Sequence, residues 1–448
     1  MKNKENLFSD APYFAIIVLL GIISGTIGVL FHLSVDWLFE SRRLVLAGFD
    51  VSTQIVVSMA FSALLALAAF LLVRYYAPEA AGSGVQEIEG AMEDLRPLRW
   101  KHILPVKFVG GFLSLGSGMT LGREGPTIHM GAAVGQALSE WFKLRTLDRK
   151  GLLAAGAAAG LAAAFNAPLA AVLFVIEETR SQFPYHLKTY MGVIFASIIS
   201  ATITEHIGGV GPELSIPEVS LPLAILPIFL VLGPVLGMLG VWLNRSIIFA
   251  LDQFDRLPDK WHHYNAPIVG AVAGLLIVIF PAATGGGEIL VHRIVLDHPG
   301  TSALLALFAI RYVMTLVSYS SGVPGGIFAP LLAVASCAGL VVGALLHLAG
   351  WNIEHLAVGC AIASMGGLFA GSIRAPLVGV VLVLELTGAY ELMLPVLITC
   401  STANLMAHKM GGRPIYEELL ERTLRKEHQP VPDKQEQLPV ELGPDEDK

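Results

Sequence analysis

The sequence predicts an all-α integral membrane protein in which two inverted repeats contribute broken helices to a common centre. Three observations support this fold class. Hydrophobic residues make up 54% of the 448 residues and charged residues only 15%, whereas soluble domains carry about 25% charged residues. Glycine and proline occur inside the apolar runs, and three motifs return in the same order about 200 residues later.

Long uncharged stretches predict the individual membrane helices. A helix needs about 20 apolar residues to cross the hydrocarbon core of a bilayer. Stretches without Asp, Glu, Lys or Arg cover residues 51–73, 151–176, 219–244 and 266–287. Because further apolar runs lie between and beyond them, we expect more than ten membrane helices or half-helices.

Glycine and proline interrupt several of these runs. The chain has 46 glycines and 25 prolines, more than the roughly 12% of an average protein. Residues 312–352 carry no Asp, Glu, Lys or Arg, yet Gly322, Pro324, Gly326 and Pro330 prevent one straight helix there. Irregular backbone at membrane depth is tolerated only where it is buried in protein or lines a cavity. Such broken helices are typical of transporters.

Three motifs predict an internal duplication. Residues 82–84, 122–126 and 167–169 resemble residues 285–287, 326–330 and 375–377, at offsets of 203, 204 and 208 residues. Matches in one order with nearly equal offsets indicate a repeat. We expect one transmembrane transport domain over residues 1–420, with a first repeat at about 12–250 and a second at about 266–416.

Charge and cysteine content exclude other classes. Part of the net charge of −7 lies in residues 421–448, which we expect to form a short charged cytoplasmic tail. Basic residues flank the first and last apolar runs, so the positive-inside rule predicts that both termini are cytoplasmic. No basic patch indicates a nucleic-acid partner. The cysteines Cys337, Cys360 and Cys400 lie in apolar sequence and indicate no disulfide, metal site or cofactor.

Glycine-rich loops that lead into helices are candidate anion sites. A helix N-terminus exposes unpaired N–H groups and a partial positive charge, and glycine lets an ion approach the backbone. Residues 82–84, 122–126 and 325–330 each fit such a loop. Three such termini that met at the membrane midplane would bind a small anion without a full positive charge. The alternative, that these glycines only permit close helix packing, explains their repeated clustering less well.

Four segments resemble the CLC chloride channels and transporters in order and spacing: residues 82–85 (Gly-Ser-Gly-Val), 122–126 (Gly-Arg-Glu-Gly-Pro), 325–330 (Gly-Gly-Ile-Phe-Ala-Pro) and 414–416 (Pro-Ile-Tyr). The resemblance covers roughly residues 12–420. It implies an all-helical homodimer in which each subunit has its own ion pathway. It further implies that the hydroxyls of Ser83 and Tyr416 and the backbone N–H groups of Ile327 and Phe328 hold a central chloride ion.

The chemistry of these four residues agrees with the resemblance. Hydroxyl and amide groups are neutral donors, which bind chloride and still release it quickly. Without the resemblance, Ser83 has an alternative role as a helix N-cap, and Tyr416 as an aromatic anchor at the membrane interface.

Glu124 is the expected gate. An ionisable residue inside a membrane segment is costly and is a functional candidate by default. Its ionised carboxylate competes with chloride for an anion site, whereas the neutral, protonated form swings aside. Binding of H⁺ and binding of Cl⁻ are thereby linked. A structural ion pair between Arg123 and Glu124 is the alternative.

Glu178 decides between an exchanger and a channel. It follows Glu177 at the end of an apolar run, and its position resembles the internal proton-transfer glutamate of exchangers in the family. Glu177 has a counterpart, Glu385, in the second repeat, so we expect a structural role for it. The alternative for Glu178 is a solvated helix end that pairs with Arg180 or Lys188.

These residues favour a proton-coupled chloride antiporter, with chloride and protons as its substrates. A passive chloride channel on the same fold is the first alternative. An intramembrane serine hydrolase that uses Ser83 or Ser117 is a distant second, because no histidine is evidently paired with either serine. His102, His129 and His347 are the histidines considered as its base. We therefore do not expect an enzyme.

One departure from the family pattern matters. Gln86 stands where the family commonly has proline, which puts the local helix start in doubt. Ser83 itself favours chloride over nitrate and fluoride, since relatives selective for those anions typically lack this serine. The chain is also too short for the paired C-terminal CBS modules of eukaryotic members. We therefore expect a prokaryotic-type exchanger of the bacterial inner membrane that binds no nucleotide.

Overall fold

The computed structural model describes residues 11–179, 183–209, 214, 219, 221–287, 290 and 300–431. These residues are almost entirely helical, and β-structure among them is limited to two isolated bridges. Most of the predicted tail, residues 432–448, lies outside the described residues. Eight helices in the described part are long and apolar enough to cross a bilayer. The predicted class, an all-α membrane protein, is confirmed.

Eight α-helices form the first part of the chain. They are α1 (Ala11–Leu46), α2 (Val51–Tyr76), α3 (Val85–Met92), α4 (Trp100–Gly116), α5 (Glu124–Trp141), α6 (Thr146–Phe165), α7 (Pro168–Glu178) and α8 (Leu187–Gly208). At 1.5 Å per residue, α3 and α7 reach only about half of the ~30 Å hydrocarbon core. They are the broken helices that the glycine and proline pattern predicts.

The second part of the chain repeats this order. Its helices are α9 (Leu226–Asp255), α10 (Asp259–Ile279), α12 (Thr301–Ser320), α13 (Phe328–Leu348), α14 (Leu356–Ser372), α15 (Pro376–Thr387), α16 (Met393–Lys409) and, beyond the repeat, α17 (Ile415–Lys426). Helices α5 and α13 begin 204 residues apart, and α7 and α15 begin 208 apart. Helix α9 packs against α14 and α16 of this second part, and the expected boundary near residue 250 stays a prediction.

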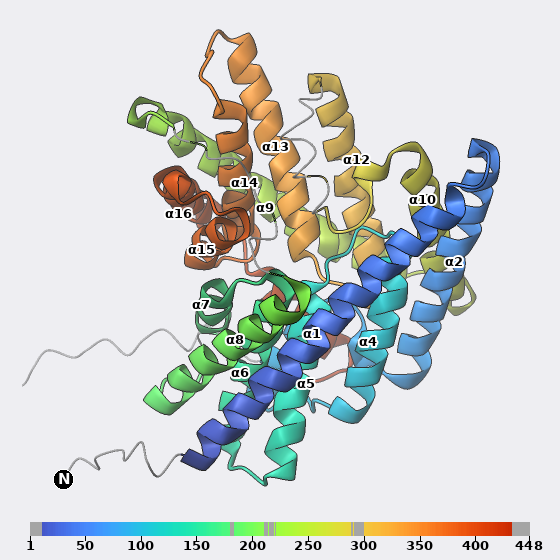
Figure 1. The fold of residues 1–448 in the computed structure, drawn as a ribbon, viewed down its shortest axis with the longest axis vertical. Coiled ribbons are helices and arrows are strands. Elements are labelled where there is room, and N and C mark those ends of the chain that lie inside the picture. The colour runs from blue at the N-terminus through green and yellow to red at the C-terminus, as the bar shows by residue number, and fades with distance from the viewer. Residues whose placement is uncertain are drawn as a thin grey trace, which may run out of the picture.

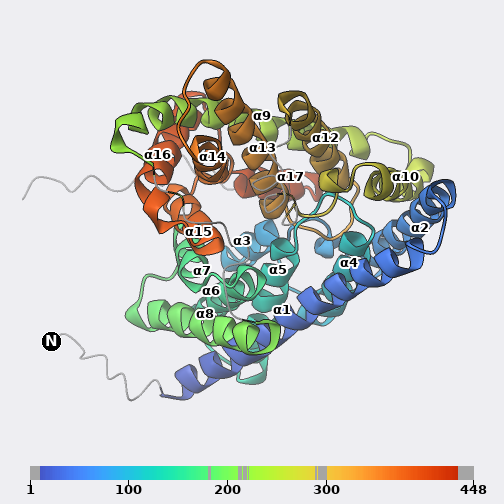
Figure 2. The ribbon, with the colours of Figure 1, turned by 45° about the horizontal axis from the view of Figure 1, so that its top comes forward.

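The two repeats meet at the centre of the molecule. In both views of the ribbon, α1 and α4–α8 occupy one side and α12–α16 the other, with α7 beside α15 at the boundary (Figures 1 and 2). The backbones of the two repeats also pair directly, because Gly82 bridges to Pro324 and Gly122 bridges to Gly326.

Helices α7 and α15 cap each other. The Glu177 carboxylate, near the end of α7, accepts a hydrogen bond from the N–H of Val378 at the start of α15 (2.9 Å). Conversely, the Glu385 carboxylate, near the end of α15, accepts one from the N–H of Ala170 at the start of α7 (2.7 Å). Such reciprocal contacts require antiparallel helices related by a two-fold operation, as inverted repeats are. They also give Glu177 the structural role that its counterpart in the second repeat suggested.

Candidate functional site

The site is built where two loop-to-helix junctions exchange backbone hydrogen bonds. The N–H of Gly122 donates to the carbonyl of Gly326 (2.8 Å), and the N–H of Gly326 donates to the carbonyl of Gly122 (2.7 Å). Helix α5 begins two residues after Gly122, and α13 begins two residues after Gly326. This pairing therefore brings two helix N-termini together, and both present unpaired N–H groups and a partial positive charge.

A third junction, before α3, joins them. The N–H of Gly82 donates to the carbonyl of Val323 (3.0 Å), and the N–H of Gly325 donates to the carbonyl of Gly82 (3.0 Å). Space for this approach depends on Gly125, because a Cβ atom there would lie 2.7 Å from Ser83 Oγ and 2.8 Å from Gly326 Cα. The three glycine clusters predicted as an anion site thus lie together.

Glu124 lies at the start of α13 instead of pointing to lipid. It is fully buried, and its Oε1 accepts a hydrogen bond from the backbone N–H of Ala329, the second residue of α13 (2.7 Å). A carboxylate at this position uses the donors and the helix dipole that would otherwise serve a small anion. Its neighbour Arg123 contacts His32 of α1 (Nη1 to Nε2, 3.1 Å).

Ala329 was not among the residues predicted for the site. The motif match singled out the N–H groups of Ile327 and Phe328, which are the N-cap and first residue of α13. However, all of the first four N–H groups of a helix lack partners within it. That rule, applied to the whole first turn, would have included Ala329.

The hydroxyls of Ser83 and Tyr416 are the polar groups that the site leaves unused. Both residues are fully buried and their hydroxyls lie beside each other, but neither makes a hydrogen bond of ordinary geometry with the described residues. A buried hydroxyl without a partner costs about 1–3 kcal/mol, so two of them in one place indicate a polar or ionic ligand. Gly125 lies beside Ser83, and the Tyr416 ring packs on Phe328 (centroids 5.9 Å apart).

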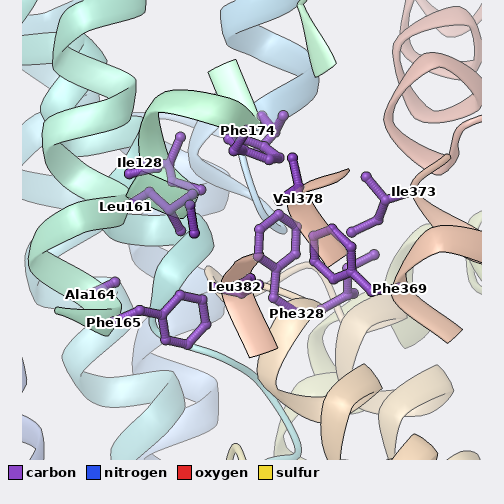
Figure 3. Close-up of a cluster of buried hydrophobic side chains, with 14 of the residues drawn as sticks. Ile128, Leu161, Ala164, Phe165, Phe174, Phe328, Phe369, Ile373, Val378 and Leu382 are labelled. Carbon is purple, nitrogen blue, oxygen red and sulfur yellow. The ribbon is translucent and has the colours of Figure 1, made fainter. Parts of the chain in front are cut away.

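An aromatic cluster holds Phe328, the first residue of α13, in place. Its ring meets Phe174 of α7 and Phe369 of α14 edge to face, with centroid distances of 5.3 and 5.1 Å. Figure 3 shows these rings together with Val378 of α15 and Ile373, which directly follows α14. Such edge-to-face pairs stabilise a defined geometry. The first turn of α13 is therefore rigidly placed against both repeats.

Glu178 is the last residue of α7 and is partly exposed. Tyr416 is close enough to both Glu178 and Glu124 for an electrostatic interaction with each. Of the two cations considered as its structural partners, Lys188 forms an ion pair with Asp148 (2.7 Å), and Arg180 lies outside the described residues. The structure thus brings Ser83, Glu124, Ile327, Phe328 and Tyr416 together and leaves Glu178 at the edge of this group.

Lys107 is a supporting residue that sequence analysis missed. It is fully buried in α4, and its ammonium donates hydrogen bonds to the carbonyls of Ala80 (3.0 Å) and Gly82 (2.7 Å). These bonds fix the loop that carries Ser83. A single lysine within an apolar run is a signal for such a role, since membrane cations commonly pair with backbone carbonyls.

Gly84 and His129 bear on two questions from the sequence: whether α3 begins normally without the usual proline, and whether Ser83 has a histidine base. Gly84 has φ of +90° and its missing Cβ would lie 2.1 Å from His129 Nδ1, so only glycine fits. Helix α3 begins at Val85 even though Gln86 replaces proline. His129 is close to the loop, but within the described part of the chain neither of its ring nitrogens has a hydrogen-bond partner, and the Ser83 hydroxyl makes no hydrogen bond of ordinary geometry. This arrangement lacks the serine–base contact that a hydrolase needs.

Comparisons with known proteins agree with this architecture. Residues 64–408 match the family model described as voltage gated chloride channel. The chain is 42% identical over 426 residues to the H(+)/Cl(-) exchange transporter ClcA of Vibrio parahaemolyticus, with 93% of this chain and 91% of the relative covered. It is 44% identical over 419 residues to the ClcA exchanger of Yersinia pseudotuberculosis, with 92% and 87% covered.

Solved structures show the same fold. A slow cyanobacterial Cl⁻/H⁺ antiporter superimposes with a TM-score of 0.88 at 37% identity, over 93% of this chain and 99% of the other. A eukaryotic CLC transporter superimposes with a TM-score of 0.80 over 93% and 74%, and at 21% identity this likeness concerns the fold alone. The family model covers Ser83, Glu124, Ile327 and Phe328 and ends before Tyr416. The chain therefore belongs to the voltage-gated chloride channel (CLC) family.

Proposed function

We propose that this protein exchanges chloride for protons across the membrane, with Glu124 as the gate. The observation that carries the proposal is the hydrogen bond from the Ala329 N–H to the Glu124 carboxylate. It makes a titratable side chain occupy the anion-binding end of a helix. The names of the ClcA relatives and of the cyanobacterial antiporter support exchange over passive conduction.

Protonation of Glu124 is the event that links the two ions. An ionised carboxylate makes a charge-assisted hydrogen bond to Ala329, which is roughly twice as strong as a neutral one. Adding a proton removes the charge and weakens both this bond and the attraction to the α13 dipole. The side chain then leaves, and a chloride ion takes its place. When the proton departs, the carboxylate returns and displaces chloride.

Chloride binds next to the gate through neutral donors. The hydroxyls of Ser83 and Tyr416 face it, together with the backbone N–H groups of Ile327 and Phe328. Neutral donors balance binding against release, as rapid transport requires. Glu178 passes protons between the cytoplasm and Glu124, and its closeness to Tyr416 supports this route.

The remaining features follow from the family and from charge placement. The protein forms a homodimer in the bacterial cell membrane, with both termini in the cytoplasm. Each subunit carries its own pathway, since Ser83, Glu124, Phe328 and Tyr416 come together within a single chain.

The test of exchange uses purified protein in liposomes loaded with chloride. External pH and chloride are recorded together as chloride leaves down its gradient. We expect protons to move uphill in the opposite direction in proportion to chloride. Chloride efflux without proton movement would make the protein a passive channel and overturn the proposal.

The Glu124→Gln variant tests the gate itself. Glutamine retains the size of the side chain but cannot bind a proton at physiological pH, so proton movement should disappear while chloride still leaks. Glu391→Gln is the matched control, since Glu391 is exposed in the short 3-10 turn before α16. Proton transport that persists in Glu124→Gln would remove Glu124 from the mechanism.

Glu178→Gln examines the proton route separately. We expect chloride flux to continue with few or no coupled protons, because the anion site is intact and only the internal proton donor is lost. The same liposome assay measures both fluxes. Unchanged coupling in this variant would leave Glu178 as a solvated helix end.

A further inference from the structure

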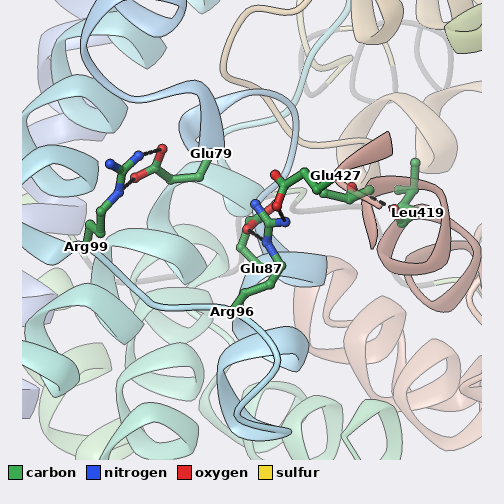
Figure 4. Close-up of polar contacts among 7 residues, drawn as sticks. Glu79, Glu87, Arg96, Arg99, Leu419 and Glu427 are labelled. Atoms are coloured by element: carbon green, nitrogen blue, oxygen red, sulfur yellow. Dashed lines mark hydrogen bonds and ion pairs between the residues drawn. The ribbon is translucent and has the colours of Figure 1, made fainter. Parts of the chain in front are cut away.

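Helix α17 carries Tyr416 in its first turn and an ion pair just past its other end. Arg96 lies between two carboxylates: its Nε contacts Glu87 at 2.6 Å, and its Nη1 contacts Glu427 at 2.6 Å. Figure 4 shows Arg96 between these two glutamates. Glu427 directly follows α17, and Glu87 lies in the first turn of α3.

This triad joins α17, which carries Tyr416, to α3, which follows the loop that carries Ser83. Ser83 comes four residues before Glu87, and Tyr416 comes eleven residues before Glu427. At 1.5 Å per residue the second separation is about 16 Å along α17. The helices also pack directly, because a Cβ at Gly90 of α3 would lie 3.1 Å from Leu420 of α17. A shift of α17 at its Glu427 end would therefore move Tyr416 relative to Ser83.

The members of the triad differ in exposure. The side chains of Arg96 and Glu87 are 10% and 7% exposed, whereas that of Glu427 is 46% exposed. Burial alone would lower the pKa of Arg96, but the neighbouring Glu87 and Glu427 carboxylates outweigh it and raise the pKa, so the guanidinium stays charged. Removing the charge of Glu427 leaves the buried Arg96–Glu87 pair intact.

Other ion pairs hold α17 to a different helix. Arg422 contacts Asp252 of α9 (2.9 Å) and also Asp255, and Lys426 contacts Asp255 (2.7 Å). These contacts attach α17 to α9, not to α3. At the same end of α17, the contact between Glu427 and Arg96 therefore attaches the helix to α3, whereas the other ion pairs attach it to α9.

We propose that Glu427 and Arg96 are positioning residues that set the separation of the Ser83 and Tyr416 hydroxyls, and through it chloride affinity and coupling. The proposal rests on the exchange function above. It goes beyond that function by assigning control of the anion site to an ion pair at the cytoplasmic end of α17.

The experiment compares Glu427→Gln with wild type in two measurements. Chloride binding is measured by isothermal titration calorimetry, and the ratio of protons to chloride is measured in the liposome assay. Because a partly exposed ion pair contributes little, we expect a chloride Kd about two- to fivefold weaker and fewer protons moved per chloride. Glu427→Asp keeps the charge and should restore part of both values.

Lys426→Gln is the matched control. It removes a charge of similar exposure from the same turn, but Arg422 still holds Asp252 and Asp255, so affinity and coupling should match wild type. A Glu427→Gln protein that is less stable to heat but unchanged in Kd and coupling would reduce the triad to a structural contact and overturn the proposal. If the wild-type protein itself showed no exchange of chloride for protons in the liposome assay, the proposed function would be refuted instead.

Discussion

One carboxylate and two hydroxyls give this site its chemistry. The Glu124 carboxylate takes a backbone donor of α13, while the hydroxyls of Ser83 and Tyr416 make no hydrogen bond of ordinary geometry with the described residues. The Glu124 carboxylate, which loses its charge on protonation, thus lies beside hydroxyl donors that stay neutral. In the proposed mechanism, this arrangement lets an anion and a proton exclude or admit each other.

Tyr416→Phe tests the hydroxyl apart from the ring. Phenylalanine retains the packing on Phe328, so the fold should be preserved. A hydrogen bond to a charged group contributes about 1.5–3 kcal/mol, and losing one should weaken the chloride Kd about tenfold or more. Calorimetric titration of chloride measures this, with Tyr390→Phe as the control because Tyr390 is 63% exposed. Equal affinity of Tyr416→Phe and wild type would exclude the hydroxyl as a ligand.

Sequence analysis predicted the motif residues but missed their supports. Glu124 could be predicted because it is a charged residue between glycines within an apolar run, and Ser83 because its motif resembles that of the family. Lys107 had a signal, a lysine within an apolar run, but its backbone partners could not be predicted. The same holds for the partners of Arg96, since they depend on which carbonyl or carboxylate the fold brings to each residue. The partner of Glu124, Ala329, is 205 residues away in sequence.

At the scale of elements, α7 and α15 stabilise each other through their ends. Each short helix carries, near its end, a glutamate whose carboxylate accepts hydrogen bonds from N–H groups in the first turn of the other helix. A carboxylate at a helix N-terminus accepts hydrogen bonds from N–H groups that lack partners within the helix, and it is attracted by the positive end of the helix dipole. The equal offsets of the two copies predicted this correspondence in sequence, but only the fold shows that the copies contact each other.

Glu385→Ala should destabilise the protein by about 1–2 kcal/mol, because it leaves N–H groups of Leu169 and Ala170 without their acceptor. Glu177→Ala should cost about as much. The two caps lie about 12 Å apart along α7, so the double variant should show nearly the sum of the two losses. Unfolding by SDS in mixed micelles measures the free energies, with exposed Glu391→Ala as the control. A cap variant as stable as that control would contradict the argument.

At the scale of the whole molecule, the two repeats of one chain build one site. Ser83 and Glu124 come from the first repeat, Ile327 and Phe328 from the second, and Tyr416 from the helix beyond it. The backbone bridges between Gly122 and Gly326 place these parts against each other. The division between the repeats was harder to predict than their existence, because the charged stretch near residue 252 suggests a linker although α9 continues through it to Asp255.

A site completed within one chain makes a prediction for the proposed dimer. A tandem fusion of one wild-type subunit and one Glu124→Gln subunit should move protons at about half the rate of a fusion of two wild-type subunits, because the intact subunit needs nothing from its neighbour. Chloride should leave through both subunits, so the ratio of protons to chloride falls as well. The liposome assay with covalently linked subunits measures both rates. Complete loss of proton transport in the mixed fusion would mean that the pathway is shared between subunits, which the single-chain origin of every site residue argues against.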